Sequence, residues 1–166
     1  MFSPFVSLLR TLGLALTGRI RFPRGRVGET VELEEGHRAV VFREVVVRPG
    51  RGRPEKPGAT FRVRFRLAGM GPRANKVFSL LPIPFFVGFP GFRGKLWLYD
   101  DRNDEWWGLY QWDTPAHAER YARSFAVRFM TRRSVPGSVS WNVLPRPTGQ
   151  AGGPNSPDIA PRPRAD

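Results

Sequence analysis

The stretch GKLWLYDDRNDEWWGLYQWD, residues 94–113, decides the fold. It predicts two antiparallel strands joined by a turn at Arg102 and Asn103, because bulky apolar side chains recur on both sides of a polar tip. A hairpin with one face in water would carry polar residues at every second position. Here only Lys95 and Gln111 interrupt the apolar pattern. We therefore expect both faces of this hairpin to be covered.

Two further strands are predicted outside the hairpin. The first is TFRVRFRL, residues 60–67, in which apolar and basic residues alternate. A period of two places the apolar side chains on one face of a strand and the guanidinium groups on the other. Those guanidinium groups belong to Arg62, Arg64 and Arg66. The second strand is SVSWNVL, residues 138–144.

Two helices are predicted between these strands. The first begins at Pro72, since proline suits a first helical turn. Its expected apolar face holds Ala74, Val77, Phe78 and Leu81. The second begins after Thr114 and follows one apolar stripe as far as Arg132. Between the first helix and the hairpin, residues 81–92 are rich in Pro and Gly, so we expect a buried loop there.

The order strand, helix, strand, strand, helix, strand is that of an α+β, ferredoxin-like fold, in which both helices cover one sheet face. This core spans residues 59–145. Residues 1–58 add an N-terminal helix, an extra strand at 38–48 and a linker rich in Pro, Gly and Arg. Residues 146–166 contain almost no large apolar side chains, so we expect a disordered tail.

The N-terminal segment, residues 2–17, predicts an amphipathic helix, because its apolar residues recur at spacings of three and four. These residues are Phe2, Phe5, Leu9, Leu12 and Leu16. Arg10 interrupts the apolar run and no basic side chain precedes it, which argues against a secretion signal. The run is also too short to span a membrane. We expect a cytoplasmic protein whose first helix either packs on the core or contacts a membrane surface.

The chain is strongly basic, with 27 Lys and Arg against 14 Asp and Glu and a formal net charge of +13. All but three of these cations are arginines, and they form no dense block. Strong positive charge is typical of proteins that bind polyanions. Because the basic residues are scattered along the chain, we do not favour nucleic acid as a partner. The absence of Cys excludes disulfides and thiolate-bound metals. We predict neither a metal nor a cofactor.

Three stretches carry a resemblance to a known superfamily: FVGFPGFRGKLWLYDD at residues 86–101, GLYQWDTPAHAERYARS at 108–124 and SVPGSVSWNVLP at 134–145. They are similar to uncharacterised actinobacterial proteins. The core resembles the dimeric α/β-barrel superfamily, which includes antibiotic-biosynthesis-type monooxygenases and haem-degrading or ligand-binding relatives. The resemblance implies a homodimer in which two bare sheet faces meet. It assigns no catalytic role to any residue of this chain, because such proteins share a scaffold and differ in activity.

A ligand site is predicted where the strand arginines share a sheet face with the aromatic hairpin. Guanidinium and indole groups around one cavity favour a flat or anionic molecule. The candidate ligand-binding residues are Arg62, Arg64, Arg66, Phe85, Phe86, Trp97, Trp106, Tyr110 and Trp112. In the alternative interpretation, the arginines lie at a solvated rim and the aromatic residues form the core or a dimer interface.

Two residues are candidates for catalysis: Asn75, which could polarise a substrate carbonyl, and His117, in the first turn of the second helix. In the alternative, Asn75 is a polar surface residue. The acidic residues at 100–105 are expected to form a solvated turn, and His37 has no partner at metal-ligand spacing.

These features predict a protein that binds a small hydrophobic or aromatic molecule, and they leave open whether that molecule is anionic. The resemblance implies a monooxygenase-like oxidation that needs no cofactor, and the sequence leaves open whether the protein is an enzyme. The alternative function is non-catalytic binding of nucleic acid or of an anionic membrane surface.

Overall fold

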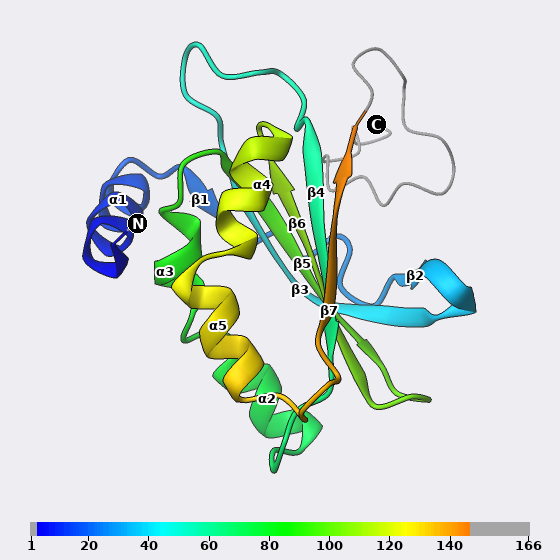
Figure 1. The fold of residues 1–166 in the computed structure, drawn as a ribbon. Helices are drawn as coiled ribbons and strands as arrows, with labels where there is room; N and C mark the ends of the chain where they lie inside the picture. Colours follow the sequence, from blue (N-terminus) through cyan, green and yellow to red (C-terminus); the bar gives the residue numbers. More distant parts are fainter. Residues whose placement is uncertain (1–2, 147–166) are drawn as a thin grey trace.

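The computed structural model describes residues 3–146. Its strands form one antiparallel sheet in the order β1-β3-β5-β6-β4-β7, with β2 paired to β3 outside this path (Figure 1). The strands are β1 (Ile20–Arg21), β2 (Thr30–Glu32), β3 (Arg38–Val47), β4 (Ala59–Phe65), β5 (Phe92–Asp100), β6 (Glu105–Trp112) and β7 (Ser140–Pro145). The helices are α1 (Pro4–Leu16), α2 (Pro72–Phe78), α3 (Ile83–Val87), α4 (Pro115–Ala122), α5 (Phe125–Arg132) and the 3-10 turn η1 (Glu34–Gly36).

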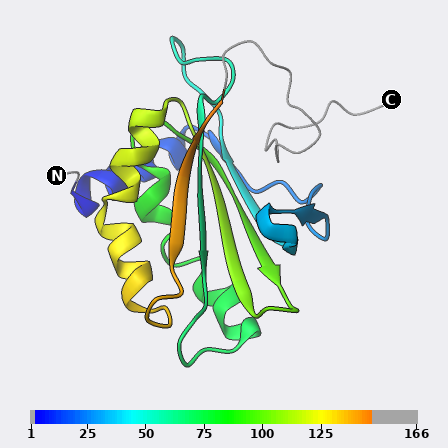
Figure 2. The ribbon, with the colours of Figure 1, turned by 45° about the vertical axis from the view of Figure 1, so that its right-hand side comes forward.

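The four strands β7-β4-β6-β5 lie in the order of a ferredoxin-like sheet. Helices α2 and α3 connect β4 to β5, and α4 and α5 connect β6 to β7. Figure 2 shows α3, α4 and α5 on one side of the sheet and β2 on the opposite side. The predicted α+β, ferredoxin-like fold is therefore confirmed.

The second face of the hairpin is covered by the chain itself. Trp107 pairs with Leu98 across the hairpin, and both side chains are buried. Val31 of β2 and the partly buried Leu33 pack over them, beside the first half of β3. The buried apolar cluster on this face contains Val31, Ala39, Val41, Leu96, Leu98, Trp107 and Leu109. The expectation of a hairpin covered on both faces is confirmed, and a second protomer is not needed to cover these residues. The homodimer stays a prediction.

The predicted strand at 38–48 is β3, and it pairs directly with β5. The N-terminal segment and the core thus contribute to one sheet. The linker that follows β3, residues 48–59, contains no helix or strand before Ala59. The division of the chain at residue 58 stays a prediction, and all but the first residue of the expected tail 146–166 lies outside the described residues.

The second predicted helix is two helices, because the chain is extended at Ser124 and divides α4 from α5. This break lets Phe125 turn toward α3, where its ring meets that of Phe85 at a right angle. The expected buried loop at 81–92 also contains a helix, α3. Its Pro84 lies in the first helical turn, where a backbone N–H has no intrahelical acceptor, so proline is tolerated at this position.

The apolar face expected for the first helix is wrong. In α2 the buried side chain is Asn75, whereas Val77 is exposed. Leu81, expected on the same face, lies beyond the end of α2 at Phe78 and is exposed. Pro82 and Pro84 shorten the helix to two turns, too few for its apolar residues to line up on the sheet.

Candidate functional site

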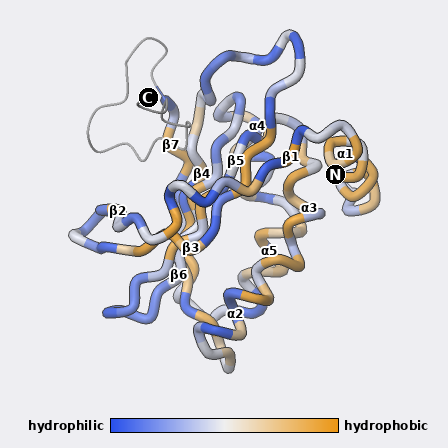
Figure 3. The backbone as a smooth tube through the Cα atoms, turned by 180° about the vertical axis from the view of Figure 1, so that it is seen from behind, coloured by the Kyte–Doolittle hydropathy of each residue, from blue (hydrophilic) through white to orange (hydrophobic). Residues whose placement is uncertain are grey.

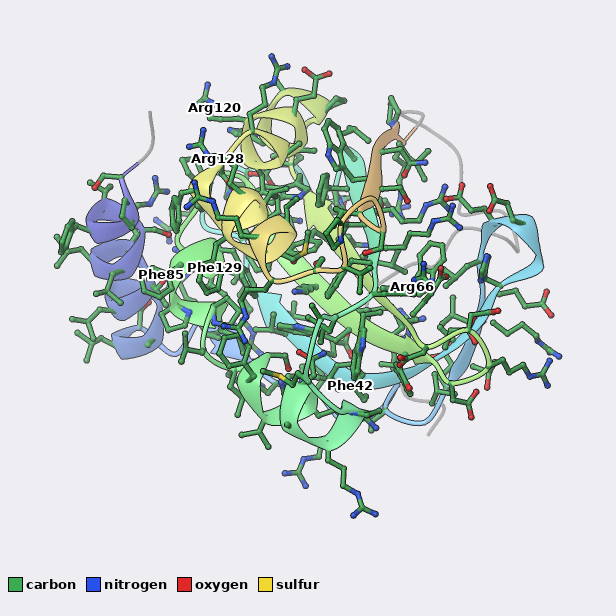
Figure 4. All side chains as sticks on the ribbon, turned by 60° about the horizontal axis from the view of Figure 1, so that its bottom comes forward. Phe42, Arg66, Phe85, Arg120, Arg128 and Phe129 are labelled. Carbon is green, nitrogen blue, oxygen red and sulfur yellow. The ribbon has the colours of Figure 1, made fainter. Side chains whose placement is uncertain are left out.

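A cavity of about 90 Å³ lies between the sheet and helices α2, α3 and α5. Its wall is largely aromatic, with Phe42, Phe65, Phe78, Phe86, Trp97 and Trp106 among its residues. Figure 4 labels Phe42 on β3 and Phe129 on α5, which line the same cavity from different elements. Phe129 is half exposed, which puts the mouth of the cavity beside α5.

Lys95 of β5 projects its amine among these rings and is only 6% exposed. Its Nζ donates a hydrogen bond of 2.6 Å to Oη of Tyr110, the residue opposite it on β6. The same Nζ lies 4.2 Å from the ring centre of Trp97 and 4.8 Å from that of Phe86. Gly108 makes room for this arrangement, since a Cβ there would lie 2.8 Å from the Tyr110 ring.

Burial lowers the pKa of Lys95 well below its usual value, and the positive charge of Arg43 lowers it further. The ring faces around Nζ favour an ammonium ion, but removal of the charge from water opposes it. Burial also raises the pKa of Tyr110 and of Tyr121. The side chain of Tyr121 also hydrogen-bonds that of Tyr110. Lys95, Tyr110 and Tyr121 thus form a buried chain that can hold a proton at the amine or release it.

Arg43 of β3 is fixed beside this chain. Its guanidinium lies 5.8 Å from the ring centre of Trp97 and donates to the carbonyl oxygen of Lys76 at 2.8 Å and to Oγ of Ser79. Burial lowers the pKa of Arg43. Because two acceptors on α2 and its C-terminal end hold the guanidinium, its charge remains close to Lys95.

The structure brings five of the predicted site residues into this cavity. They are Asn75, Phe86, Trp97, Trp106 and Tyr110. Asn75 is buried, contrary to the surface position of the alternative interpretation. Their roles in binding or catalysis stay predictions.

The strand arginines lie on the other face of the sheet, because Arg62 pairs with Leu109 and Arg64 with Trp107. A recess of about 200 Å³ there does combine guanidinium groups with Trp107. However, Arg62 forms an ion pair with Glu34 of η1, and Arg64 forms one with Glu35 at 3.0 Å. Arg66 follows the end of β4 and does not line this recess.

The remaining predicted residues also lie outside the cavity. Phe85 packs against Phe125, and Trp112 packs between Phe92 and Tyr121 in the core. The backbone N–H of His117 donates a hydrogen bond to Oγ1 of Thr114, and this hydrogen bond caps the N-terminus of α4. Burial lowers the pKa of His117.

Sequence reasoning missed the role of Lys95. It noted Lys95 as a break in the apolar pattern of the hairpin, and a lone lysine in an otherwise apolar strand was the available signal. Arg43 gave no signal, because it lies among the valines of another strand.

His37 also has partners that spacing did not reveal. Its Nδ1 lies 3.2 Å from Oδ2 of Asp100 and 3.4 Å from Oε2 of Glu105, at the base of the hairpin turn. Asp100 is buried, so the expectation of a fully solvated turn is wrong at this residue. Burial opposes the charge of Asp100, but hydrogen bonds from Asn103 and His37 outweigh it and lower its pKa. The three side chains have the ligand types of a metal site, and hydrogen bonds and ion pairing between them account for the arrangement.

No protein-family model matches the sequence, and no curated protein matches it. Solved structures are similar in fold. A ferredoxin-fold protein from Listeria monocytogenes related to antibiotic biosynthesis monooxygenases is 12% identical, with a TM-score of 0.51, over 69% of this chain and 68% of its own. A monooxygenase-like protein from Listeria innocua is 11% identical, with a TM-score of 0.51, over 71% and 69%. A haem-degrading enzyme from Listeria monocytogenes is 11% identical, with a TM-score of 0.48, over 77% and 97%.

At such identities, structural similarity speaks for the fold and not for the activity. The first two structures agree with the ferredoxin-like fold described above and with the resemblance to monooxygenase-related proteins. The chain has the ferredoxin-like fold seen in proteins related to antibiotic biosynthesis monooxygenases.

Proposed function

We propose that this protein binds a small, single-ring aromatic molecule with an acidic hydroxyl group, and that Lys95 accepts the proton of that hydroxyl. The observation that carries the proposal is the Lys95 amine, which lies inside an aromatic cavity and hydrogen-bonds Tyr110 at 2.6 Å. A ring of the ligand would lie against Trp97 and Phe86, with its hydroxyl directed at Nζ.

The size of the cavity supports a single ring. An engineered apolar cavity of about 150 Å³ accepts benzene, and sites for drug-sized ligands measure roughly 300–1,000 Å³. At about 90 Å³ the present cavity suits one ring after a small movement at its mouth. Phe129 and Met130 line the cavity from α5 and can supply that movement, since neither is fully buried. A haem-sized ligand would require a much larger rearrangement.

The electrostatics support proton transfer from ligand to protein. An amine with a lowered pKa is uncharged more often than a solvent-exposed lysine and can act as a general base. After transfer, the ligand is a phenolate and Lys95 is an ammonium ion, so the charges pair inside the cavity. The ring faces of Trp97, Phe86 and Tyr110 then stabilise the ammonium.

A phenolate produced in this way is electron-rich and can react with O2 without a cofactor. For a 1,4-dihydroxybenzene, the reaction breaks one ring C–H bond and forms one C–O bond, giving a hydroxylated quinone and water. The organic molecule loses four electrons and O2 gains four. One oxygen atom enters the ring, and the other leaves as water with two hydrogens of the substrate.

Titration with 4-nitrophenol tests the proposal, because its ionised form absorbs at longer wavelength. At a pH where the free phenol is un-ionised, the wild-type protein is expected to produce the phenolate band on binding. Lys95→Met should bind 4-nitrophenol without that band, and Lys56→Met, which alters an exposed lysine, should behave as wild type. Absence of binding to the wild-type protein, or binding without ionisation, would contradict the proposal.

Oxygen uptake with 1,4-dihydroxybenzene tests the second step separately. The expected result is uptake by the wild-type protein above the rate of autoxidation, and none above that rate with Lys95→Met. Ionisation of 4-nitrophenol without oxygen uptake would limit the function to binding and proton transfer.

A further inference from the structure

Helix α1 buries two hydroxyl residues and leaves most of its apolar residues exposed. The two residues of α1 that are buried are Ser7 and Thr11. The exposed apolar residues are Phe5, Val6, Leu8, Leu9, Leu12 and Leu16, and Phe5 and Leu16 are 77% and 81% exposed. Figure 3 shows α1 as a largely hydrophobic coil at the edge of the molecule. A contiguous exposed apolar surface of this kind marks an interaction site in a folded protein.

Hydrogen bonds to α3 fix the orientation of α1. Oγ1 of Thr11 donates to the carbonyl oxygen of Pro84 at 2.6 Å, and Oγ of Ser7 donates to that of Phe85. The backbones are also close, since a Cβ on Gly88 would lie 1.9 Å from the carbonyl oxygen of Ser7. Rotation of its apolar side inward would break both hydrogen bonds and place apolar side chains over the carbonyl oxygens of Pro84 and Phe85, leaving these acceptors unsatisfied.

A basic recess of about 590 Å³ lies directly beside the helix. Its wall contains Arg10 of α1 together with Arg19, Arg51 and Arg53. Asp113 is the acidic residue in that wall, and it is paired with Arg53 at 2.7 Å. The recess therefore keeps an excess of positive charge, adjacent to the apolar side of α1.

We infer that α1 docks this protein on an anionic lipid bilayer, with its apolar side among the acyl chains and lipid phosphates at the basic recess. A short helix of 13 residues can lie in the plane of the interface, where apolar burial and attraction to anionic lipid act together. No helix among residues 3–146 is long and apolar enough to cross a membrane.

Charge favours lipid over a second copy of the chain. Each copy carries a formal net charge of +13. Two copies that met through α1 would bring two basic recesses together, and like charges repel across such a contact. An anionic bilayer instead supplies the opposite charge, and it presents acyl chains beside its phosphates, as α1 and the recess require.

Vesicle flotation with the full chain tests the inference. The expected result is binding to vesicles of equal parts phosphatidylcholine and phosphatidylserine, weaker binding to pure phosphatidylcholine, and release of part of the bound protein at high salt. Leu9→Gln with Leu12→Gln should lower the partition coefficient by about tenfold or more, since each leucine loses its apolar burial. Both side chains are exposed, so the fold should not change.

Val77→Gln with Leu144→Gln provides the matched control, since these exposed apolar residues lie on α2 and β7, away from α1 (Figure 1). Arg10→Gln with Arg19→Gln should weaken binding to anionic vesicles and leave binding to neutral vesicles unchanged. Ionisation of 4-nitrophenol should be unaffected by all of these changes.

Three results would overturn the inference. The first is no difference between the wild-type protein and the Leu9/Leu12 variant on anionic vesicles. The second is binding of inorganic phosphate at the recess without vesicle binding. The third is a dimer in light scattering that the Leu9/Leu12 variant dissociates, together with no affinity for vesicles, which would identify a second copy as the partner.

Discussion

The Nζ of Lys95 lies 2.6 Å from Oη of Tyr110, on the neighbouring strand and inside the aromatic layer between sheet and helices. A lysine amine that is 6% exposed loses most of its hydration. The hydroxyl of Tyr110 replaces part of it, and Tyr121 in turn hydrogen-bonds Tyr110. Burial of the Lys95 amine therefore lowers the stability of the folded state. The same amine is the proton acceptor that we propose for the cavity.

Tyr110→Phe tests how much the hydrogen bond to Tyr110 stabilises the buried amine of Lys95. The change removes one hydroxyl, fills nearly the same volume and leaves the Lys95 amine without its hydrogen-bond acceptor. We expect a loss of about 1–3 kcal/mol in the free energy of unfolding, measured by urea denaturation. Stability equal to that of the wild-type protein would show that the amine finds another acceptor.

The stability of the protein should increase with pH up to the alkaline range because of Lys95. The folded state lowers the pKa of Lys95, so between that value and the unfolded value of about 10.4 the unfolded chain binds more protons. The free energy of unfolding therefore rises with pH across this window, by at most about 1.4 kcal/mol per pH unit. Above pH of about 10, Tyr110 acts in the opposite direction, because its pKa is raised in the folded state.

Lys95→Met should remove the contribution of Lys95 to this slope. The measurement is urea denaturation at several pH values from neutral to alkaline, comparing Lys95→Met with Lys56→Met. Met has nearly the volume of Lys without the charge, so the variant should also be more stable than wild type at neutral pH. Equal pH slopes for wild type and Lys95→Met would mean that the amine keeps an ordinary pKa in the folded state.

The hairpin illustrates what sequence alone can predict. Alternation along a strand is a property of the backbone, so the two faces at Trp97 and Trp107 follow from the order of residues. The environment of Lys95 does not follow in the same way. Arg43 approaches it from β3, far away in the sequence, and Phe86 approaches it from the helix before β5. Local periodicity carries no information about which elements meet.

Helix α1 illustrates a second limit. Spacing predicts the amphipathic helix correctly, but burial of apolar residues is the usual rule, and it suggests the wrong side. The acceptors for Ser7 and Thr11 are the carbonyl groups of Phe85 and Pro84 in the five-residue helix α3, and the last four carbonyl groups of a helix have no intrahelical donor. Pro84 lies in the first turn of that helix, although the sequence suggested it as a helix breaker. The inverted orientation of α1 thus depends on an element that was not expected.

Asp100 should stabilise the hairpin turn as a carboxylate. Its Oδ1 accepts from the backbone N–H of Arg102 at 3.1 Å, and its Oδ2 accepts from Nδ2 of Asn103 at 2.7 Å and lies close to His37. The folded state lowers its pKa, so this stabilisation is present above the unfolded value of about 3.9 and is lost as the pH falls through the folded value.

Asp100→Ala should therefore cost about 1–3 kcal/mol at neutral pH. The difference from wild type should shrink in acid, where both lack the carboxylate. Urea denaturation at neutral and acidic pH measures both quantities. A cost that is the same at both pH values would assign the effect to packing and not to the charge of Asp100.

Gly88→Ala should detach α1 from the rest of the protein. The added Cβ would lie 1.9 Å from the carbonyl oxygen of Ser7 and 2.7 Å from the carbonyl carbon, and backbone atoms cannot move aside as the end of a flexible side chain can. We expect the hydrogen bonds of Ser7 and Thr11 to α3 to be lost while the sheet remains folded. Hydrogen–deuterium exchange of residues 4–16 should then be faster than in the wild-type protein, with unchanged exchange in β5 and β6.

Gly13→Ala is the control, because nothing lies within 4 Å of a Cβ at that position and alanine favours a helix. It should leave exchange in α1 unchanged or slower. If α1 is held mainly by the contacts of its polar side, a detached helix should still present its leucines to lipid, so Gly88→Ala should retain binding to anionic vesicles. Fast exchange in α1 of the wild-type protein, equal to that of Gly88→Ala, would contradict the fixed orientation on which the exposed apolar side depends.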